Sequence, residues 1–307
     1  RYVGRKGEHG TGGEGPRCGR LDDATSGGGP RWAQWDYGPQ KRTLVSAQFA
    51  GRVRSVGMVS LTAAWQQIEE SRLKARFGAQ DREVQFERVG VRSISLDVDR
   101  MLRSWRTSVG AYWSMDNVQS EAWMERRADG MRLDTPALTR YPNGGSETGS
   151  LAVYTGLERR WNRWKIEAAA RYTRGWLESR FDAQPGLALP FQQVSYNRGA
   201  LTGSGTLHWT PRQRTGIHAV LSTAFRNPNV DDVGKVRAKD GFAIVPSDQL
   251  KPERLAGLEM GGFWRSRNGQ VKADVSGFYT RLMDAIVPVD TVLFGANGEA
   301  VETIVVE

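Results

Sequence analysis

Two of the three histidines, His208 and His218, are spaced so that a β-hairpin could bring them together. If its turn is centred on Gln213, the two imidazoles face each other on one side of the sheet, the lumenal side of a closed barrel. Leu207 and Ile217 then occupy the opposite side. The pair could contribute to a metal or haem site, or form a polar pair on the inner wall. We favour the polar pair, because a metal site needs further ligands and the sequence indicates none.

Other chemical motifs are missing from the sequence. We find no nucleophile–base pair, paired-carboxylate motif or HExxH, and the glycines of "GTGGEG" precede no helical pattern, so they are not a phosphate cradle. Cys18 is the only cysteine, which rules out an internal disulfide framework and a cysteine-based zinc site. We therefore predict that the protein is not an enzyme and has no resident cofactor or metal.

Composition further narrows the class of protein. The 307 residues carry a net charge of +9, but the basic residues are scattered among 34 acidic ones, so we predict no binding to nucleic acid. The sequence contains no run of 18 apolar residues, which argues against a transmembrane helix. A membrane β-barrel remains possible, because its strands alternate and have unremarkable mean hydropathy.

Apolar and polar residues alternate with the two-residue period of a β-strand from about residue 43 onward. Residues 164–177 are typical: Ile166, Ala170 and Tyr172 share one face, whereas Lys165 and Glu167 lie on the other. We predict strands near 43–50, 56–66, 85–98, 104–115, 149–159, 164–177, 194–209, 216–225, 255–265, 270–282 and 300–306, with 31–38 either a short strand or an ordered loop. The chain is therefore predicted to be all-β.

The connections alternate between short and long. Short turns fall at "GRVRS", "DRMLR", "RRWNR", "TPRQRT" and "RSRNG", and long polar loops at about 67–84, 116–148, 178–193, 226–254 and 283–299. This alternation is typical of outer-membrane barrels, whose short turns face the periplasm and long loops the outside. We predict a partial antiparallel transmembrane β-barrel of about eleven strands over 31–307, preceded by a Gly-rich loop or disordered segment over 1–30. Aromatic residues near strand ends fit interfacial girdles: Trp65, Trp113, Trp161, Trp164, Trp176, Trp209, Phe225 and Trp264.

Four segments of the C-terminal half carry a resemblance to a known family. "TAFRNPNVDDVGKV", "VPSDQLKPE", "LEMGGFW" and "FYTRLMDAIV" closely resemble the barrel of TonB-dependent outer-membrane receptors, in particular the haem/haemoglobin-type branch. The resemblance implies a 22-stranded barrel of the bacterial outer membrane, closed by an N-terminal plug. It also implies uptake of a scarce ligand such as an iron chelate or haem, powered through a periplasmic TonB-type partner.

The sequence departs from this pattern in three ways. We recognise no plug before the barrel, only about half the strands, and "VETIVVE" without a terminal aromatic residue at the C-terminus. We therefore expect a fragment that lacks the plug and the C-terminal strands, with two bare sheet edges and no transport of its own.

The "FRNP" and "LKPE" boxes bracket the candidate ligand-binding residues. The intervening loop contains no histidine, so the iron-ligating histidine of the haem branch has no counterpart in it. The ligand-contact candidates are Arg226, Asn227, Asp231, Asp232, Lys235 and Arg237. The structural residues of the boxes are Phe225, Pro228, Leu250, Lys251, Pro252 and Glu253. We favour a structural role for the boxes, with prolines where a ladder donor is dispensable and an Arg226–Glu253 pair across the loop base.

Other functions share parts of this pattern. A passive porin or a barrel adhesin has the same topology without energy coupling, and a soluble β-rich carbohydrate-binding protein has the same strand period. A plug upstream would distinguish a receptor from the first two, and partitioning into membranes would distinguish it from the third. The ligand itself is not encoded in any motif that we recognise.

Overall fold

The computed structural model describes residues 32–182, 191–234, 237–239, 242–246, 250–294 and 300–306. Within this part of the chain, twelve strands form one sheet in which every pairing is antiparallel. The Gly-rich segment expected over 1–30 lies outside the described residues.

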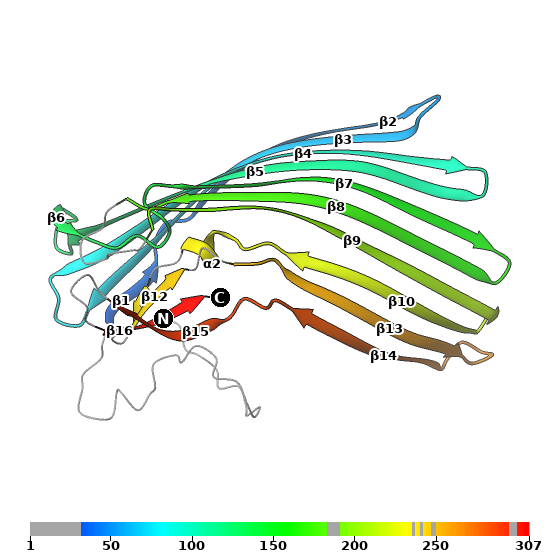
Figure 1. The fold of residues 1–307 in the computed structure, drawn as a ribbon. Helices are drawn as coiled ribbons and strands as arrows, with labels where there is room; N and C mark the ends of the chain where they lie inside the picture. Colours follow the sequence, from blue (N-terminus) through cyan, green and yellow to red (C-terminus); the bar gives the residue numbers. More distant parts are fainter. Residues whose placement is uncertain are drawn as a thin grey trace.

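This sheet, which we call the wall, is long and curved, and its strands lie side by side along a common axis (Figure 1). The order is β1-β3-β4-β5-β7-β8-β9-β10-β13-β14, with β2 also on β3 and β6 on β5. The strands are β1 (Trp32–Tyr37), β2 (Lys41–Val53), β3 (Gly57–Arg76), β4 (Asp81–Leu102), β5 (Trp105–Arg126), β6 (Arg132–Pro136), β7 (Ser146–Trp161), β8 (Trp164–Arg180), β9 (Gln193–Arg212), β10 (Thr215–Arg226), β13 (Glu253–Arg265) and β14 (Lys272–Met283).

The all-β prediction is confirmed, and the expected strands of the wall are present, but several are longer than the sequence pattern predicted. The prediction of a long loop over 67–84 is wrong. β3 and β4 pair from Met58↔Asp99 to Lys74↔Glu83, and only residues 77–80 connect them. Likewise, the first part of the expected loop 116–148 is the end of β5, and the rest contains β6. These strand ends are rich in charged residues, so the apolar alternation that marks the other strands is lost there.

The remaining elements lie at the end of the wall opposite the short turns (Figure 1). The expected loop 226–254 contains a short helix, α2 (Val230–Gly234), and the strands β11 (Arg237–Lys239) and β12 (Phe242–Pro246). With β15 (Pro288–Phe294) and β16 (Ala300–Val306), these two strands form a second sheet ordered β11-β12-β16-β15. The predicted strand 300–306 is therefore present, but it belongs to this second sheet and does not continue the wall.

The two faces of the wall differ in chemistry. On β8, the outward side chains from Trp164 to Tyr172 are apolar, and Arg174 follows them. On β13, the outward side chains from Trp264 back to Ala256 are apolar or glycine, and Arg254 ends the run. The registers continue this band across the sheet, since partners in a ladder share a face. We call it the apolar belt. Its nine residues on β8 and on β13 match the span of a tilted strand in a bilayer.

Aromatic residues border the belt on both sides. Trp161, Trp164, Trp209 and Trp264 lie at the short turns. Trp65, Trp113 and Phe225 lie toward the other border: Gln67 follows Trp65 on the outer face, Met115 and then Asn117 follow Trp113, and β10 ends after Phe225. The belt is exposed in the structure: Leu221 is 63% and Leu151 50% accessible, so no second sheet covers these rows in the described residues. No helix among the described residues is long and apolar enough to span a membrane.

Candidate functional site at the loop base and inner wall

Arg226 and Glu253 form an ion pair at the base of the loop between β10 and β13, as the sequence predicted. They are register partners at the first rung of the ladder, and Nε of Arg226 donates to Glu253 Oε2. The Nη1 group of Arg226 also donates to Asp232 Oδ2 in α2, at 2.7 Å. The backbone N–H of Ile286 donates to the other oxygen of Glu253 at 2.9 Å. The hydrogen bond from Arg226, then that from Ile286, lowers the pKa of Glu253, which lies beyond the apolar belt.

Asn229 and Asp232 begin α2 with a reciprocal pair of hydrogen bonds. The backbone N–H of Asp232 donates to Asn229 Oδ1 at 3.0 Å, and the N–H of Asn229 donates to Asp232 Oδ2 at 2.9 Å. This is the capping-box arrangement, with an acid in place of the usual Glu at the third helical position. Asp232 thus satisfies two partners, and the buried Pro228 precedes the cap. The sequence "NPNVDD" therefore directs the chain from a strand into a helix.

The helix packs against an apolar cluster on the inner face of the wall. Val230 and Val233 of α2 are buried together with Val118, Leu177, Phe181, Val194, Tyr196 and Leu250. Leu250, from the second box, contributes to the same cluster. The two boxes therefore meet in space: one supplies the helix and the other an anchor beside it. This burial supports the structural role that we favoured for them.

Asn227 is also held within the protein. The Tyr196 hydroxyl donates to Asn227 Oδ1 at 2.8 Å. A Cβ atom on Gly175 would lie 2.1 Å from Asn227 Nδ2, so the glycine leaves the space that the amide occupies. Three of the six ligand-contact candidates, Arg226, Asn227 and Asp232, are thus engaged in contacts that position α2.

Asp231, in α2, lies near residues that the sequence did not single out. Arg140, from the loop after β6, approaches Asp231 at 3.7 Å and stacks over the Tyr141 ring at 4.7 Å. Burial, opposed by Arg140 and reinforced by Asp231, raises the pKa of Tyr141 to about 12, so this phenol is neutral at physiological pH. Glu87 and Ser120 lie on the neighbouring inner wall and are buried. The apolar alternation could not reveal these groups, because they belong to strand ends and loops that lack it.

The remaining predicted residues have varied positions. Phe225 lies on the outer face, half-buried, at the border of the belt; Pro252 is buried and Lys251 exposed. Arg237 is the first residue of β11, and Lys235 lies outside the described residues. Ligand contact by the loop residues stays a prediction.

His208 and His218 are register partners, as the hairpin geometry predicted, and their ring centroids are 5.9 Å apart. They lie on the inner face, each beside a carboxylate: His208 is 3.4 Å from Glu167, and His218 is 3.2 Å from Glu259. In the part of the chain that the structure describes, no group of three or more His, Cys, Asp or Glu side chains could hold a metal ion. The geometry is that of a polar pair on the inner wall.

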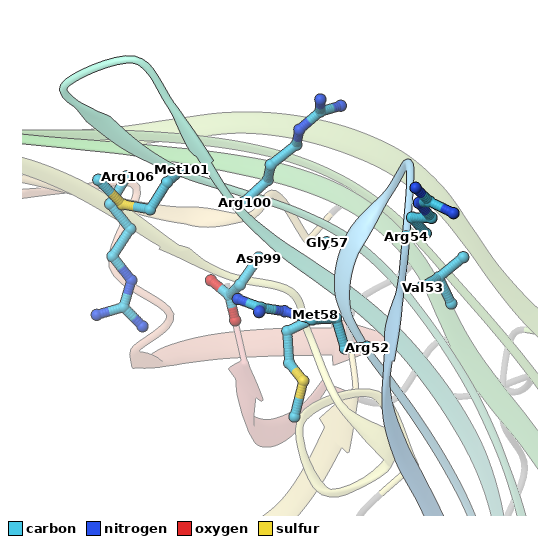
Figure 2. Close-up of a pocket in the computed structure, with 9 residues that line it drawn as sticks. All are labelled: Arg52, Val53, Arg54, Gly57, Met58, Asp99, Arg100, Met101 and Arg106. Carbon is cyan, nitrogen blue, oxygen red and sulfur yellow. The ribbon is translucent and has the colours of Figure 1, made fainter.

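The short-turn end has a hollow of its own. A cavity of about 450 Å³ is lined there by Arg52, Val53, Arg54, Gly57, Met58, Asp99, Arg100, Met101 and Arg106 (Figure 2). Asp99 and Met58 point to one side of the sheet and Arg100 to the other, as the alternation of strand residues requires. None of the sequence-predicted site residues lines this hollow.

An antiparallel wall with an apolar outer belt, aromatic borders and a polar inner face defines a segment of a transmembrane β-barrel. The family model for the TonB dependent receptor-like β-barrel matches residues 7–303. The chain belongs to this family. No curated protein matches the sequence.

Several solved structures share the fold. The copper transporter OprC matches with a TM-score of 0.67 at 13% identity, over 89% of this chain and 42% of that one. A double mutant of the Serratia marcescens hemophore receptor HasR, in complex with hemophore HasA and heme, matches at 0.56 and 13%, over 87% and 46%. The ferric yersiniabactin uptake receptor FyuA from Yersinia pestis matches at 0.55 and 16%, over 81% and 37%.

These identities establish the fold alone. The chain spans less than half the length of each of these three proteins. Their names refer to copper, a hemophore and ferric yersiniabactin, so the likeness does not single out the haem-type branch.

Proposed function

We propose that these residues form part of the barrel of a bacterial outer-membrane receptor that imports a scarce ligand with energy from a TonB-type partner. The observation that carries the proposal is the apolar belt on the outer face over a polar inner wall. An exposed belt of this height is costly in water, whereas in a bilayer it meets hydrocarbon, where strand pairing must satisfy the backbone groups.

The inner wall carries the polar groups that a transport barrel requires. Its hydrogen-bonded polar groups include Ser114 with Ser150 at 3.1 Å, Lys165 with Glu167 at 2.6 Å, and the two histidine–carboxylate pairs. Such groups line a water-accessible passage, because the same groups facing lipid would be expensive. Their mixed sign also leaves the identity of the ligand open.

The ligand class that we propose is an iron chelate, haem or a similar metal-containing compound. The family membership and the printed names of the structural neighbours support this class. Between the two boxes, contact with ligand would involve Asp231, Lys235 and Arg237, because Arg226, Asn227 and Asp232 hold α2 in place. The haem-type branch has no particular support from this loop, which contains no histidine.

The test uses the full natural polypeptide that contains these residues, expressed in cells deleted for the gene. Uptake of ⁵⁵Fe-siderophores, haem and copper is measured under metal starvation, with and without a protonophore. An energy-coupled receptor gives uptake of one ligand class that collapses with the protonophore. A passive porin gives uptake that the protonophore does not change, and an adhesin gives none.

A soluble carbohydrate-binding protein is the remaining alternative. Leu221, Val275 and Tyr279 are 63%, 76% and 69% exposed on the outer face of the wall, and a soluble monomer rarely tolerates such a contiguous band. Recovery of the protein in the detergent-free soluble fraction, monodisperse and folded, would contradict the membrane assignment.

A further inference from the structure

The short-turn end of the wall is strongly cationic. Each of the five turns, with its adjoining strand ends, carries at least two arginine or lysine residues, whereas the acidic residues there are Asp99, Glu158, Glu167 and Asp274. All four acids face inward, where Glu158 accepts a hydrogen bond from Arg160 Nε at 2.8 Å. Arg100 and Arg159 face outward at this rim, on the side of the sheet away from these carboxylates.

Arg159 has the most defined position in this rim. It faces outward on β7, and its guanidinium carbon lies 5.4 Å from the centroid of the Trp105 ring and 5.7 Å from that of Trp161. Rings on two sides of a guanidinium fix its plane and attract its charge. The Nε atom is buried and makes no hydrogen bond to any described residue. Its register partners, Trp105 and Ile166, offer the side chain no acceptor.

The neighbouring tryptophans place Arg159 at the border of the apolar belt. Trp161 pairs with Trp164, whose ring stacks on Trp209 at 5.6 Å and 21°. Tryptophan rows of this kind mark the level of lipid headgroups. A guanidinium at this level, next to Leu157 of the belt, gains greatly from an anionic partner and costs free energy without one.

We propose that Arg159, held between Trp105 and Trp161, binds the phosphate of an anionic phospholipid in the leaflet that faces the short turns. The planar guanidinium offers paired N–H donors that match phosphate oxygens. The tryptophans and Leu157 favour a lipid headgroup over free phosphate, because they continue from the guanidinium into the belt that would hold the acyl chains. Arg103 and Arg163, in the β4–β5 and β7–β8 turns, add positive charge at this end of the wall. The inference rests on the proposed membrane location.

The test is native mass spectrometry of the full natural polypeptide in detergent, titrated with phosphatidylglycerol or with uncharged diacylglycerol. We expect phosphatidylglycerol to bind selectively, and Arg159→Gln to weaken it about tenfold, the loss of a charge-assisted contact. Arg159→Lys keeps the charge but loses the stacked guanidinium plane, so its affinity for phosphatidylglycerol should lie between those of the wild type and Arg159→Gln. Arg267→Gln, in the β13–β14 turn, is the matched control and should change binding less than twofold.

The outcomes separate this inference from the membrane assignment. Equal phosphatidylglycerol binding by the wild type and Arg159→Gln would overturn the site, as would full competition by millimolar inorganic phosphate. Failure of the wild type to insert into any lipid or detergent phase would overturn the membrane assignment itself. Heat-modifiable migration in gels verifies that each variant is folded, so loss of lipid by an unfolded variant is not mistaken for support.

Discussion

Leu221 lies at the centre of the apolar belt on β10, between Ile217 at the tryptophan border and Phe225 at the other. Its side chain is 63% accessible and faces outward. If that surface meets hydrocarbon, Leu221→Arg places a charge near the bilayer midplane, which costs about 2–4 kcal/mol. If the surface meets water, the same change at an exposed position should cost less than about 0.5 kcal/mol.

Two further variants test the direction and depth of this effect. Ser222→Arg changes the next residue, which faces inward and has Ser204 and Gly257 as its register partners. This substitution should cost less than about 1 kcal/mol. Ile217→Arg is outward but opposite Trp209, at the border, and should cost about 0–1 kcal/mol. The expected order of cost for the three arginine substitutions is Leu221 > Ile217 ≥ Ser222. It follows from the alternation of faces and from depth in the bilayer alone.

The assay is guanidinium-induced unfolding of the full natural polypeptide from lipid vesicles, followed by tryptophan fluorescence, with heat-modifiable gel migration as a second probe. Equal costs for Leu221→Arg and Ser222→Arg would refute the assignment of the two faces. A stabilising Leu221→Arg would indicate a surface in water.

Three further predictions concern the loop base. Arg226→Ala removes the bonds to Glu253 and α2 and should lower the free energy of local opening by about 1–2 kcal/mol, seen as faster hydrogen exchange at the first β10–β13 rungs. Because the folded pKa of Glu253 is depressed, its contribution is present above the unfolded pKa of about 4.3 and is lost as pH falls through the folded value; exchange there should accelerate on acidification, and Glu253→Gln should abolish that dependence. Gly175→Ala pushes Asn227 from its place and should cost about 1–2 kcal/mol, whereas Gly205→Ala, with nothing within 4 Å of its Cβ position, should be nearly neutral in chemical unfolding.

The strands of the apolar belt and their outward faces could be predicted from the sequence, because side chains in a strand alternate between its two faces with a period of two residues. Ile166, Ala168, Ala170 and Tyr172 alternate with Glu167, Ala169 and Arg171, so the strand, its face and its register neighbours follow from parity. The pairing of His208 with His218 likewise followed from a hairpin centred on Gln213, the register that the shift between Thr215 and Ile217 produces. Where the period holds, one residue fixes the orientation of the rest of the strand.

The strand ends beyond the belt could not be predicted, because their surroundings differ. Residues 67–76 and 117–126 remain paired, yet water and loops contact their faces, so charged side chains replace the apolar row. The segment after β10 was likewise taken as loop, although Asn229 and Asp232 form a helix cap. The capping spacing was visible in "NVDD", but a five-residue helix is stable only through the burial of Val230 and Val233, which depends on the assembled wall.

The central claim is that successive side chains of the wall strands alternate between hydrocarbon and an aqueous interior. The most direct measurement is a spin-label scan of residues 164–173 on β8, in the full natural polypeptide reconstituted into nanodiscs with Cys18 replaced. Labels at even positions, such as 166, 168 and 170, should be accessible to oxygen and shielded from a water-soluble nickel complex; odd positions should show the reverse. Equal nickel accessibility at both sets of positions would contradict the claim.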